Sequence, residues 1–197
     1  MNNTISINER QRIKRILDSL SIGNNKSSMT EYAYFVKTYS HQVLDFTSRM
    51  VADKKDAEEL SQDAFVKAYR SLASFRFQSS FCTWVCRIAY HEALDHLRRQ
   101  KQHWVDIEDV QLAERQPADE EFSTDREERI QLMEEAIDDL PPDEQMLIHL
   151  YYYKEKPLRE IAYIMDANPK ALATRLHRIR RKLLSTINSK EDETSRR

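Results

Sequence analysis

The chain has 197 residues, of which 40% are hydrophobic and 32% are charged, with a formal net charge of −2. This length suits one or two compact domains. Only one glycine is present, so turns that need a left-handed backbone are scarce, and neither a sheet-rich fold nor a glycine-cradled phosphate site is expected. The five prolines fall where helical periodicity starts or stops. We therefore expect an all-α protein.

No targeting, membrane or cofactor signal stands out in the sequence. The first residues lack an apolar run and no segment approaches 18 apolar residues, so we expect neither a signal peptide nor a membrane span, and a cytoplasmic protein. Two cysteines do not make a disulfide framework. Cys82 and Cys86 could be imagined as a zinc site with His91 and His96. Both cysteines, however, lie inside a predicted helix, and we expect no metal and no other cofactor.

The N-terminal half is predicted to be a helical bundle that follows a short extension. Residues 1–28, the extension, contain a brief amphipathic pattern and then a polar break at Gly23, which fits either a small docking helix or a frayed leader. Apolar residues then recur at helical spacing in three segments, the last running from Phe81 to Lys101. We predict that residues 29–101 form an antiparallel helical domain.

The C-terminal half is predicted to be a second helical domain joined by a tether. Residues 102–125 lose all periodicity, and the stretch 102–128 holds ten acidic residues against two basic ones, so a flexible acidic linker is expected. Residues 126–187 should form about four helices, of which the first two span 126–140 and 143–153. Residues 188–197 are expected to be a disordered tail. The expected core of this domain consists of Leu147, Leu150, Ile161, Ile164, Leu172 and Leu176.

Residues 158–184 are typical of a helix-turn-helix that ends in a basic helix. Asn168 is a suitable N-cap, and Pro169 suits the first helical position. Apolar residues follow at spacings of four, three and four, and no acidic residue occurs between 167 and 189. A helix buried on one side and cationic on the other, after a short helix and a tight turn, suits the DNA major groove. The alternative is an ordinary solvated face.

A second candidate surface lies on the helix predicted from Phe81. Trp84, Arg87 and His91 share one face of this helix, and an aromatic and polar loop precedes it. Aromatic rings interleaved with arginine and small polar groups can stack unpaired bases and bind their edges. The alternative is that Trp84 belongs to the core and that the basic residues after it are solvated.

Three stretches, residues 56–75, 81–101 and 140–183, together resemble the extracytoplasmic-function sigma factors, which are two-domain bacterial transcription initiation factors. The stretches occur in the family's order and spacing, although the resemblance does not extend to residues 1–28. It implies a region 2-like domain at 29–101, which binds core polymerase and melts the −10 element, and a region 4-like domain at 126–187, which reads the −35 element. The chain would then be an alternative sigma factor and not an enzyme.

The resemblance also implies roles for individual residues. The positions implied for polymerase binding are Asp56, Glu59, Gln62, Asp63, Phe65 and Tyr69. The alternative is that Phe65 and Tyr69 belong to the core and that the acidic residues are merely solvated. Those implied for the −10 element are Phe75, Gln78, Ser79, Ser80, Trp84, Arg87, His91, Arg98 and Arg99. Those implied for the −35 element are Lys170, Thr174, Arg175, His177, Arg178 and Arg181. His91 stands where asparagine is common in the family, so an unusual −10 preference is expected.

The expected partners are core RNA polymerase, promoter DNA and an anti-sigma factor, which in this family is often membrane-anchored. Two alternatives stay open. A conventional helix-turn-helix regulator would bind duplex DNA without polymerase, and an adaptor would occupy polymerase without reading DNA.

Overall fold

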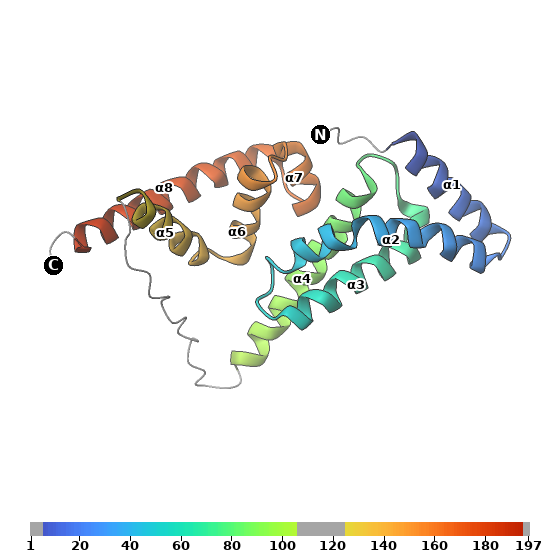
Figure 1. Cartoon of the computed structure of the whole chain (residues 1–197), viewed down its shortest axis with the longest axis horizontal. Coiled ribbons are helices and arrows are strands. Elements are labelled where there is room, and N and C mark those ends of the chain that lie inside the picture. Colours follow the sequence, from blue (N-terminus) through green and yellow to red (C-terminus); the bar gives the residue numbers. More distant parts are fainter. Residues whose placement is uncertain (1–5, 106–124, 195–197) are drawn as a thin grey trace.

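The computed structural model describes residues 6–105 and 125–194, with side chains placed for 6–101 and 130–189 (Figure 1). Every regular element in these ranges is a helix, which confirms the all-α prediction. The elements are α1 (Ile7–Ser21), α2 (Asn25–Thr47), α3 (Lys54–Arg70), the 3₁₀ helix η1 (Leu72–Ser74), α4 (Phe81–Val105), α5 (Asp125–Asp138), α6 (Pro142–Ile148), the π-helical turn η2 (His149–Tyr153), α7 (Leu158–Met165) and α8 (Pro169–Thr194).

Side-chain caps explain where the key helices begin. The Asp53 carboxylate accepts a hydrogen bond of 2.9 Å from the backbone N–H of Asp56, which fixes the start of α3. The Asn168 side chain likewise accepts a bond of 2.8 Å from the N–H of Lys170, and Pro169 takes the first position of α8. The helix start predicted at Asn168 is therefore present in the structure.

Helices α1–α4 pack around one aromatic core. Phe35 and Phe81 are both completely buried, and their ring centres lie 4.4 Å apart between α2 and α4. Helix α1 packs along α2 and buries Ile13 and Ile16 completely. The N-terminal amphipathic pattern thus forms a docked helix, which decides between the two alternatives that the sequence left open.

Helices α5–α8 enclose a second core, in which all six residues predicted from the sequence are buried. Two boundaries differ from the prediction. The helix expected over 143–153 is α6 followed by a π-helical turn, and α8 continues to Thr194 instead of ending near 187. Most of the predicted acidic linker lies outside the described residues. Across the described residues, none of the helices is sufficiently long and apolar to cross a membrane.

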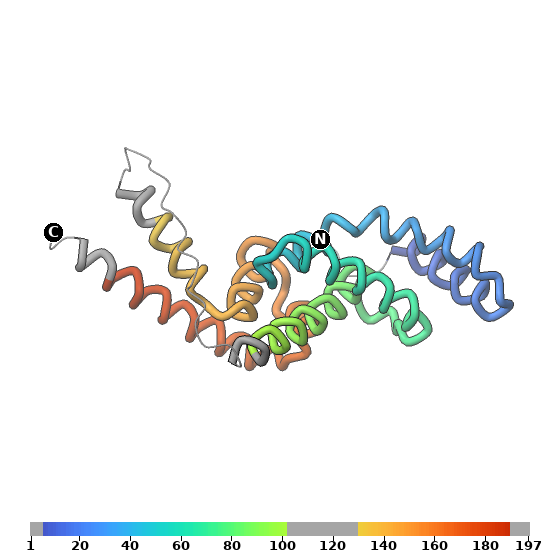
Figure 2. Tube along the Cα trace, turned by 90° about the horizontal axis from the view of Figure 1, so that it is seen from below, coloured from blue at the N-terminus to red at the C-terminus, as the bar shows by residue number. Residues whose placement is uncertain are grey.

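The two helical groups touch through α4 and α7. These helices lie side by side in Figure 1, and the view turned by 90° in Figure 2 shows the same neighbours. Helix α7 ends at Asp166, which takes the left-handed conformation with φ 53°. This left-handed residue turns the chain into α8, where many helices would use a glycine.

Candidate nucleic-acid interface

The outward face of α8 is polar and predominantly cationic. Leu172, Leu176 and Ile179 are turned inward and buried, so the intervening positions face solvent. The exposed side chains among the predicted −35 positions are Lys170, Thr174, His177, Arg178 and Arg181. These groups lie on one side of a helix that starts directly after a tight turn, and Arg178 also has a 3.6 Å contact with Glu144 of α6. A predominantly cationic helix face of this kind suits the DNA major groove.

Arg175 is the exception among the predicted −35 residues. It is half-buried, and its guanidinium forms an ion pair with Asp143 and a longer contact of 3.5 Å with Glu144 of α6. Burial alone would lower the pKa of Arg175, but its hydrogen bond to Asp143 raises the pKa overall. Arg175 therefore joins α6 to α8, and its charge is already compensated within the protein. The prediction that it is free to hold a phosphate is not supported by this geometry.

The loop between α3 and α4 packs Phe75 inward against Trp84 of α4, whereas Phe77 is half-buried. Phe75 and Trp84 are almost fully buried, with ring centres 4.8 Å apart. Ser79 is buried as well, and the Ser80 hydroxyl caps the start of α4 by accepting from the Thr83 N–H at 3.1 Å. Among the predicted base-contacting groups of this loop, Gln78 is the one exposed to solvent. Trp84 thus belongs mainly to the core, as the alternative interpretation held.

Arg87, central to the predicted −10 face, is held by the C-terminal domain. Its guanidinium donates to the Asp166 carboxylate at 2.6 Å and to the Tyr163 carbonyl at 2.5 Å, and it lies 5.0 Å from the centre of the Tyr163 ring. Arg87 is therefore not free for a DNA strand in this arrangement of the domains.

A buried carboxylate reinforces the same contact between the domains. Glu160 of α7 is 5% exposed, and it accepts a 2.7 Å hydrogen bond from the Thr83 hydroxyl of α4. Lys156 compensates its charge at 2.5 Å. Sequence reasoning missed Glu160, although a lone acid between apolar positions of a short amphipathic helix is a usable signal for a buried partner.

The remaining predicted −10 residues lie further along α4. His91 is half-buried, whereas Arg98 and Arg99 are exposed. Arg98 has a 3.3 Å surface ion pair with Asp95, which is weak enough to exchange for a phosphate. This end of α4 therefore presents accessible positive charge.

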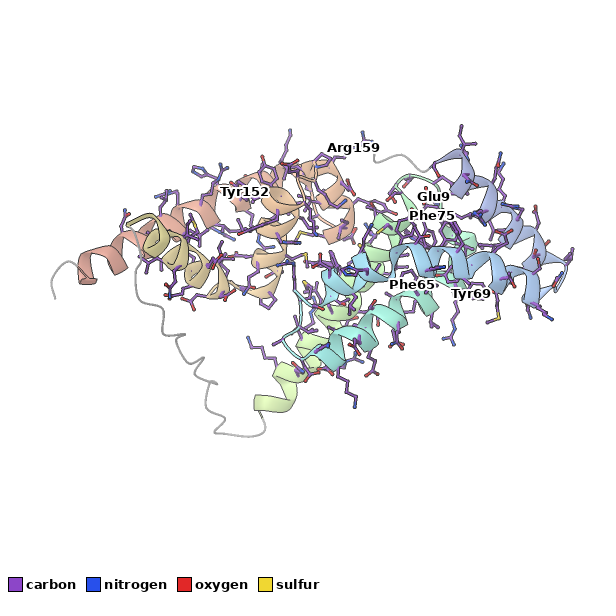
Figure 3. All side chains as sticks on the ribbon, in the orientation of Figure 1. Glu9, Phe65, Tyr69, Phe75, Tyr152 and Arg159 are labelled. Carbon is purple, nitrogen blue, oxygen red and sulfur yellow. The ribbon has the colours of Figure 1, made fainter. Side chains whose placement is uncertain are left out.

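The predicted polymerase-binding residues of α3 divide into two sets. Phe65 is buried, and the Tyr69 hydroxyl shares a 2.7 Å hydrogen bond with Ser28, so neither ring is an exposed anchor (Figure 3). The Tyr69 ring also packs on Tyr32 of α2, with ring centres 4.9 Å apart. Asp56 lies 3.1 Å from His96 of α4. The exposed remainder is polar and consists of Glu59, Gln62 and Asp63.

Among the described residues, no three side chains gather into a possible metal site.

Comparison with known proteins finds one matching family model in each of the two helical domains. Residues 35–103 match the family model for Sigma-70 region 2, and residues 130–183 match the model for Sigma-70, region 4. The chain is 34% identical over 164 residues to the ECF RNA polymerase sigma-E factor of Escherichia coli strain K12, covering 79% of this chain and 85% of that protein. It is 31% identical over 154 residues to the RNA polymerase sigma-H factor of Pseudomonas aeruginosa, covering 74% and 80%.

Two solved structures share the fold. The sigma factor RpoE of Bartonella quintana, crystallised in complex with the anti-sigma factor NepR, superposes with a TM-score of 0.60 at 20% identity, over 80% of this chain and 97% of that chain. CnrH, in complex with the cytosolic domain of CnrY, superposes with a TM-score of 0.55 at 18% identity, over 90% and 98%.

The two helical domains correspond to the two matched regions of Sigma-70, so the chain is in the class of bacterial sigma factors. This chain belongs to the extracytoplasmic-function RNA polymerase sigma factors. It is accordingly an alternative sigma factor, which directs RNA polymerase to promoters.

Proposed function

We propose that this sigma factor reads the −35 element with the exposed face of α8 and captures the −10 element with α4 and the loop before it. The observation that carries the proposal is the exposed, predominantly cationic face of α8, which follows the left-handed turn at Asp166. Thr174, His177 and Arg178 carry groups that suit base edges, whereas Lys170 and Arg181 suit phosphates.

At the −10 element, a base must leave the stack, and the protein must offset a cost of a few kcal/mol. Gln78 is the exposed edge-binding group of the loop, and His91 offers a ring nitrogen further along α4. Arg98 and Arg99 follow at the solvent-exposed end of the helix, where they can neutralise the backbone of the opened strand.

Core polymerase binding is assigned to the acidic rim of α3, formed by Glu59, Gln62 and Asp63. Because Phe65 is buried and Tyr69 is half-buried, with its hydroxyl bonded to Ser28, this rim acts mainly by charge and hydrogen bonding, which favours fast association more than tight anchoring. The chain supplies specificity and binding energy and has no catalytic step of its own. Transcription is carried out by the polymerase that it recruits.

Arg87 must leave Asp166 before it can contact DNA, so the contact between α4 and α7 keeps the free chain in an inactive form. An anti-sigma factor is the expected inhibitory partner, because the sigma factor RpoE of Bartonella quintana, which shares the fold, was crystallised in complex with the anti-sigma factor NepR. Such a partner would act by covering or stabilising this closed form.

The test is promoter-dependent transcription with purified core polymerase on a library of genomic upstream regions. We expect new, specific starts that appear only with this protein. The Arg178→Ala variant should lose about tenfold in activity at promoters that depend on a −35 element, because one good base contact is worth about 1–3 kcal/mol.

Arg180→Ala is the matched control, since Arg180 is an exposed arginine of the same helix that lines an apolar groove instead of the recognition face. Its activity should stay at the wild-type level. Specific duplex binding by the chain alone, with no core binding and no polymerase-dependent starts, would support a conventional regulator instead.

A further inference from the structure

The N-terminal helix α1 reaches the loop to which base capture is assigned. It contacts η1, and the guanidinium of Arg10 lies 5.1 Å from the centre of the Phe77 ring. Figure 3 shows Glu9, in the first turn of α1, in the same part of the molecule as Phe75, where the loop begins. A segment that precedes the residues matched by the region 2 family model, which begin at residue 35, therefore contacts the loop of the proposed −10 site.

The first turn of α1 is firmly anchored. Its N-cap Ser6 forms a reciprocal capping box with Glu9. Glu9 is itself 8% exposed and accepts a hydrogen bond from the Tyr39 hydroxyl of α2. One and two turns further on, Ile13 and Ile16 are completely buried. The backbone that carries Arg10 is therefore held in place, whereas Arg10 itself is exposed.

Phe77 has a backbone conformation that few aromatic residues adopt. Its φ is 57°, in the left-handed region, and its side chain is only half-buried. Such a residue persists only where its surroundings hold it, and it often marks a functional site. The Phe77 ring packs on Phe75 at 5.0 Å, and Phe75 packs in turn on Trp84 at 4.8 Å. The Arg10 guanidinium is a further contact of the Phe77 ring.

The residue after Phe77 is Gln78, which is exposed, as is Arg76 on the other side of Phe77. The direction of Gln78 depends on the backbone angles of Phe77, because the two residues share a peptide plane. A shift of the Phe77 ring that alters its backbone angles therefore changes the direction of the neighbouring Gln78 side chain. A cation over an aromatic ring is a directional contact, so it can select one ring position among several.

We propose that Arg10 is a positioning residue for −10 recognition, which holds the Phe77 ring and so fixes the direction in which Gln78 meets the captured base. This inference rests on the proposed function, because it takes the loop to be the base-binding element. Arg10 acts through Phe77 and does not contact the DNA backbone.

The experiment measures binding of fluorescent single-stranded −10 oligonucleotides to the holoenzyme formed with core polymerase. Arg10→Gln should weaken binding of the preferred sequence about two- to fivefold, the range expected for loss of an exposed cation–π contact, and should flatten the preference between bases. Arg10→Lys, which keeps a cation, should be intermediate. Lys14→Gln removes another exposed cation of α1, one turn further on, and should leave both binding and base preference unchanged.

Two readouts separate positioning from direct DNA contact. If Arg10 acts through the Phe77 ring, Arg10→Gln should have no further effect in a Phe77→Leu background, so the two changes should not be additive. The dependence of affinity on salt should also be the same for wild type and Arg10→Gln. A slope reduced by about 0.7, the value for one lost phosphate contact on a single strand, would overturn the inference. Additive losses in the double variant would overturn it as well.

Failure of this inference is distinguishable from failure of the proposed function. If wild-type holoenzyme binds the −10 strand and Arg10→Gln behaves like Lys14→Gln, only the role of Arg10 is refuted. If wild-type holoenzyme binds no −10 strand, the assignment of the loop is wrong, and the role of Arg10 is wrong with it. Thermal unfolding of each variant serves as the check that α1 stays docked, since Ile13 and Ile16 are untouched.

Discussion

Thr83→Val removes the buried hydrogen bond between the domains and changes little else in shape. The Thr83 hydroxyl donates to the Glu160 carboxylate at 2.7 Å, and valine replaces that hydroxyl with a methyl group of similar size. Glu160 would then keep Lys156 as its partner but lose its contact with α4. We expect the closed form, in which α4 and α7 are in contact, to lose stability relative to an open form.

The size of the effect follows from the burial of the acceptor. A hydrogen bond to a charged group contributes about 1.5–3 kcal/mol, and the lower end applies here because Lys156 continues to compensate Glu160. A loss of about 1.5 kcal/mol corresponds to about a tenfold rise in the ratio of open to closed molecules.

Single-molecule energy transfer between the two domains measures that ratio directly. Dyes on unnatural residues at the exposed positions Glu58 of α3 and Ser185 of α8 leave both native cysteines unlabelled. Ser80→Ala is the matched control, because Ser80 bonds to the same Thr83 hydroxyl at 2.7 Å without reaching Glu160. An open population that rises equally in both variants, or in neither, would refute the reasoning.

Three further predictions test charges elsewhere in the chain. Asp166→Asn keeps a residue type that tolerates the left-handed backbone but removes the carboxylate that pairs with Arg87. Because this ion pair is exposed, the open population should rise by only about two- to fivefold. The control is Asp95→Asn, which removes a surface ion pair on α4 and should not change the open population. Burial, assisted by the nearby cations Arg49 and Lys154, lowers the pKa of His149 from 6.5 to about 4. As the pH falls, the unfolded chain is therefore protonated at this histidine before the folded chain is. Above pH 6.5 His149 is neutral in both states and does not lower the free energy of unfolding. As the pH falls towards 4, the free energy of unfolding should decrease by up to about 3 kcal/mol. In urea titrations, His149→Gln should flatten this dependence on pH. Arg175→Met should cost about 1–2 kcal/mol of stability, whereas Arg178→Ala should change stability by less than about 0.5 kcal/mol; equal losses would contradict the division of roles between them.

The sequence was most informative where structure is determined locally. The start of α8 depends on Asn168 and Pro169 and on an apolar stripe, all within three turns, so both the helix-turn-helix and its buried face were predictable. The exposed positions of α8 follow from the same periodicity. The two domain cores were predictable for the same reason, since each arises from amphipathic helices that must cover one another.

Contacts between distant segments were not predictable in this way. Arg175 and Arg178 look alike in the sequence. In the structure Arg175 is half-buried and held by Asp143, whereas Arg178 is exposed and reaches α6 only through a 3.6 Å contact with Glu144. Phe65 was expected at a partner interface, but helical periodicity does not show which side of α3 meets α2. The contact of Glu160 with Thr83 joins residues 77 positions apart, and no local pattern encodes it.

Under the proposed function, the closed form determines the order in which partners bind. Arg87 cannot hold Asp166 and a DNA strand at once, whereas Glu59 and Asp63 of α3 are exposed in the closed form. Polymerase can therefore dock first, and the domains open afterwards. The apparent affinity of the free chain for the −10 strand is its intrinsic affinity scaled by the open fraction. Thr83→Val should thus strengthen −10 strand binding by up to about tenfold and leave the affinity for core polymerase unchanged; equal gains in both affinities would show that polymerase also requires the open form.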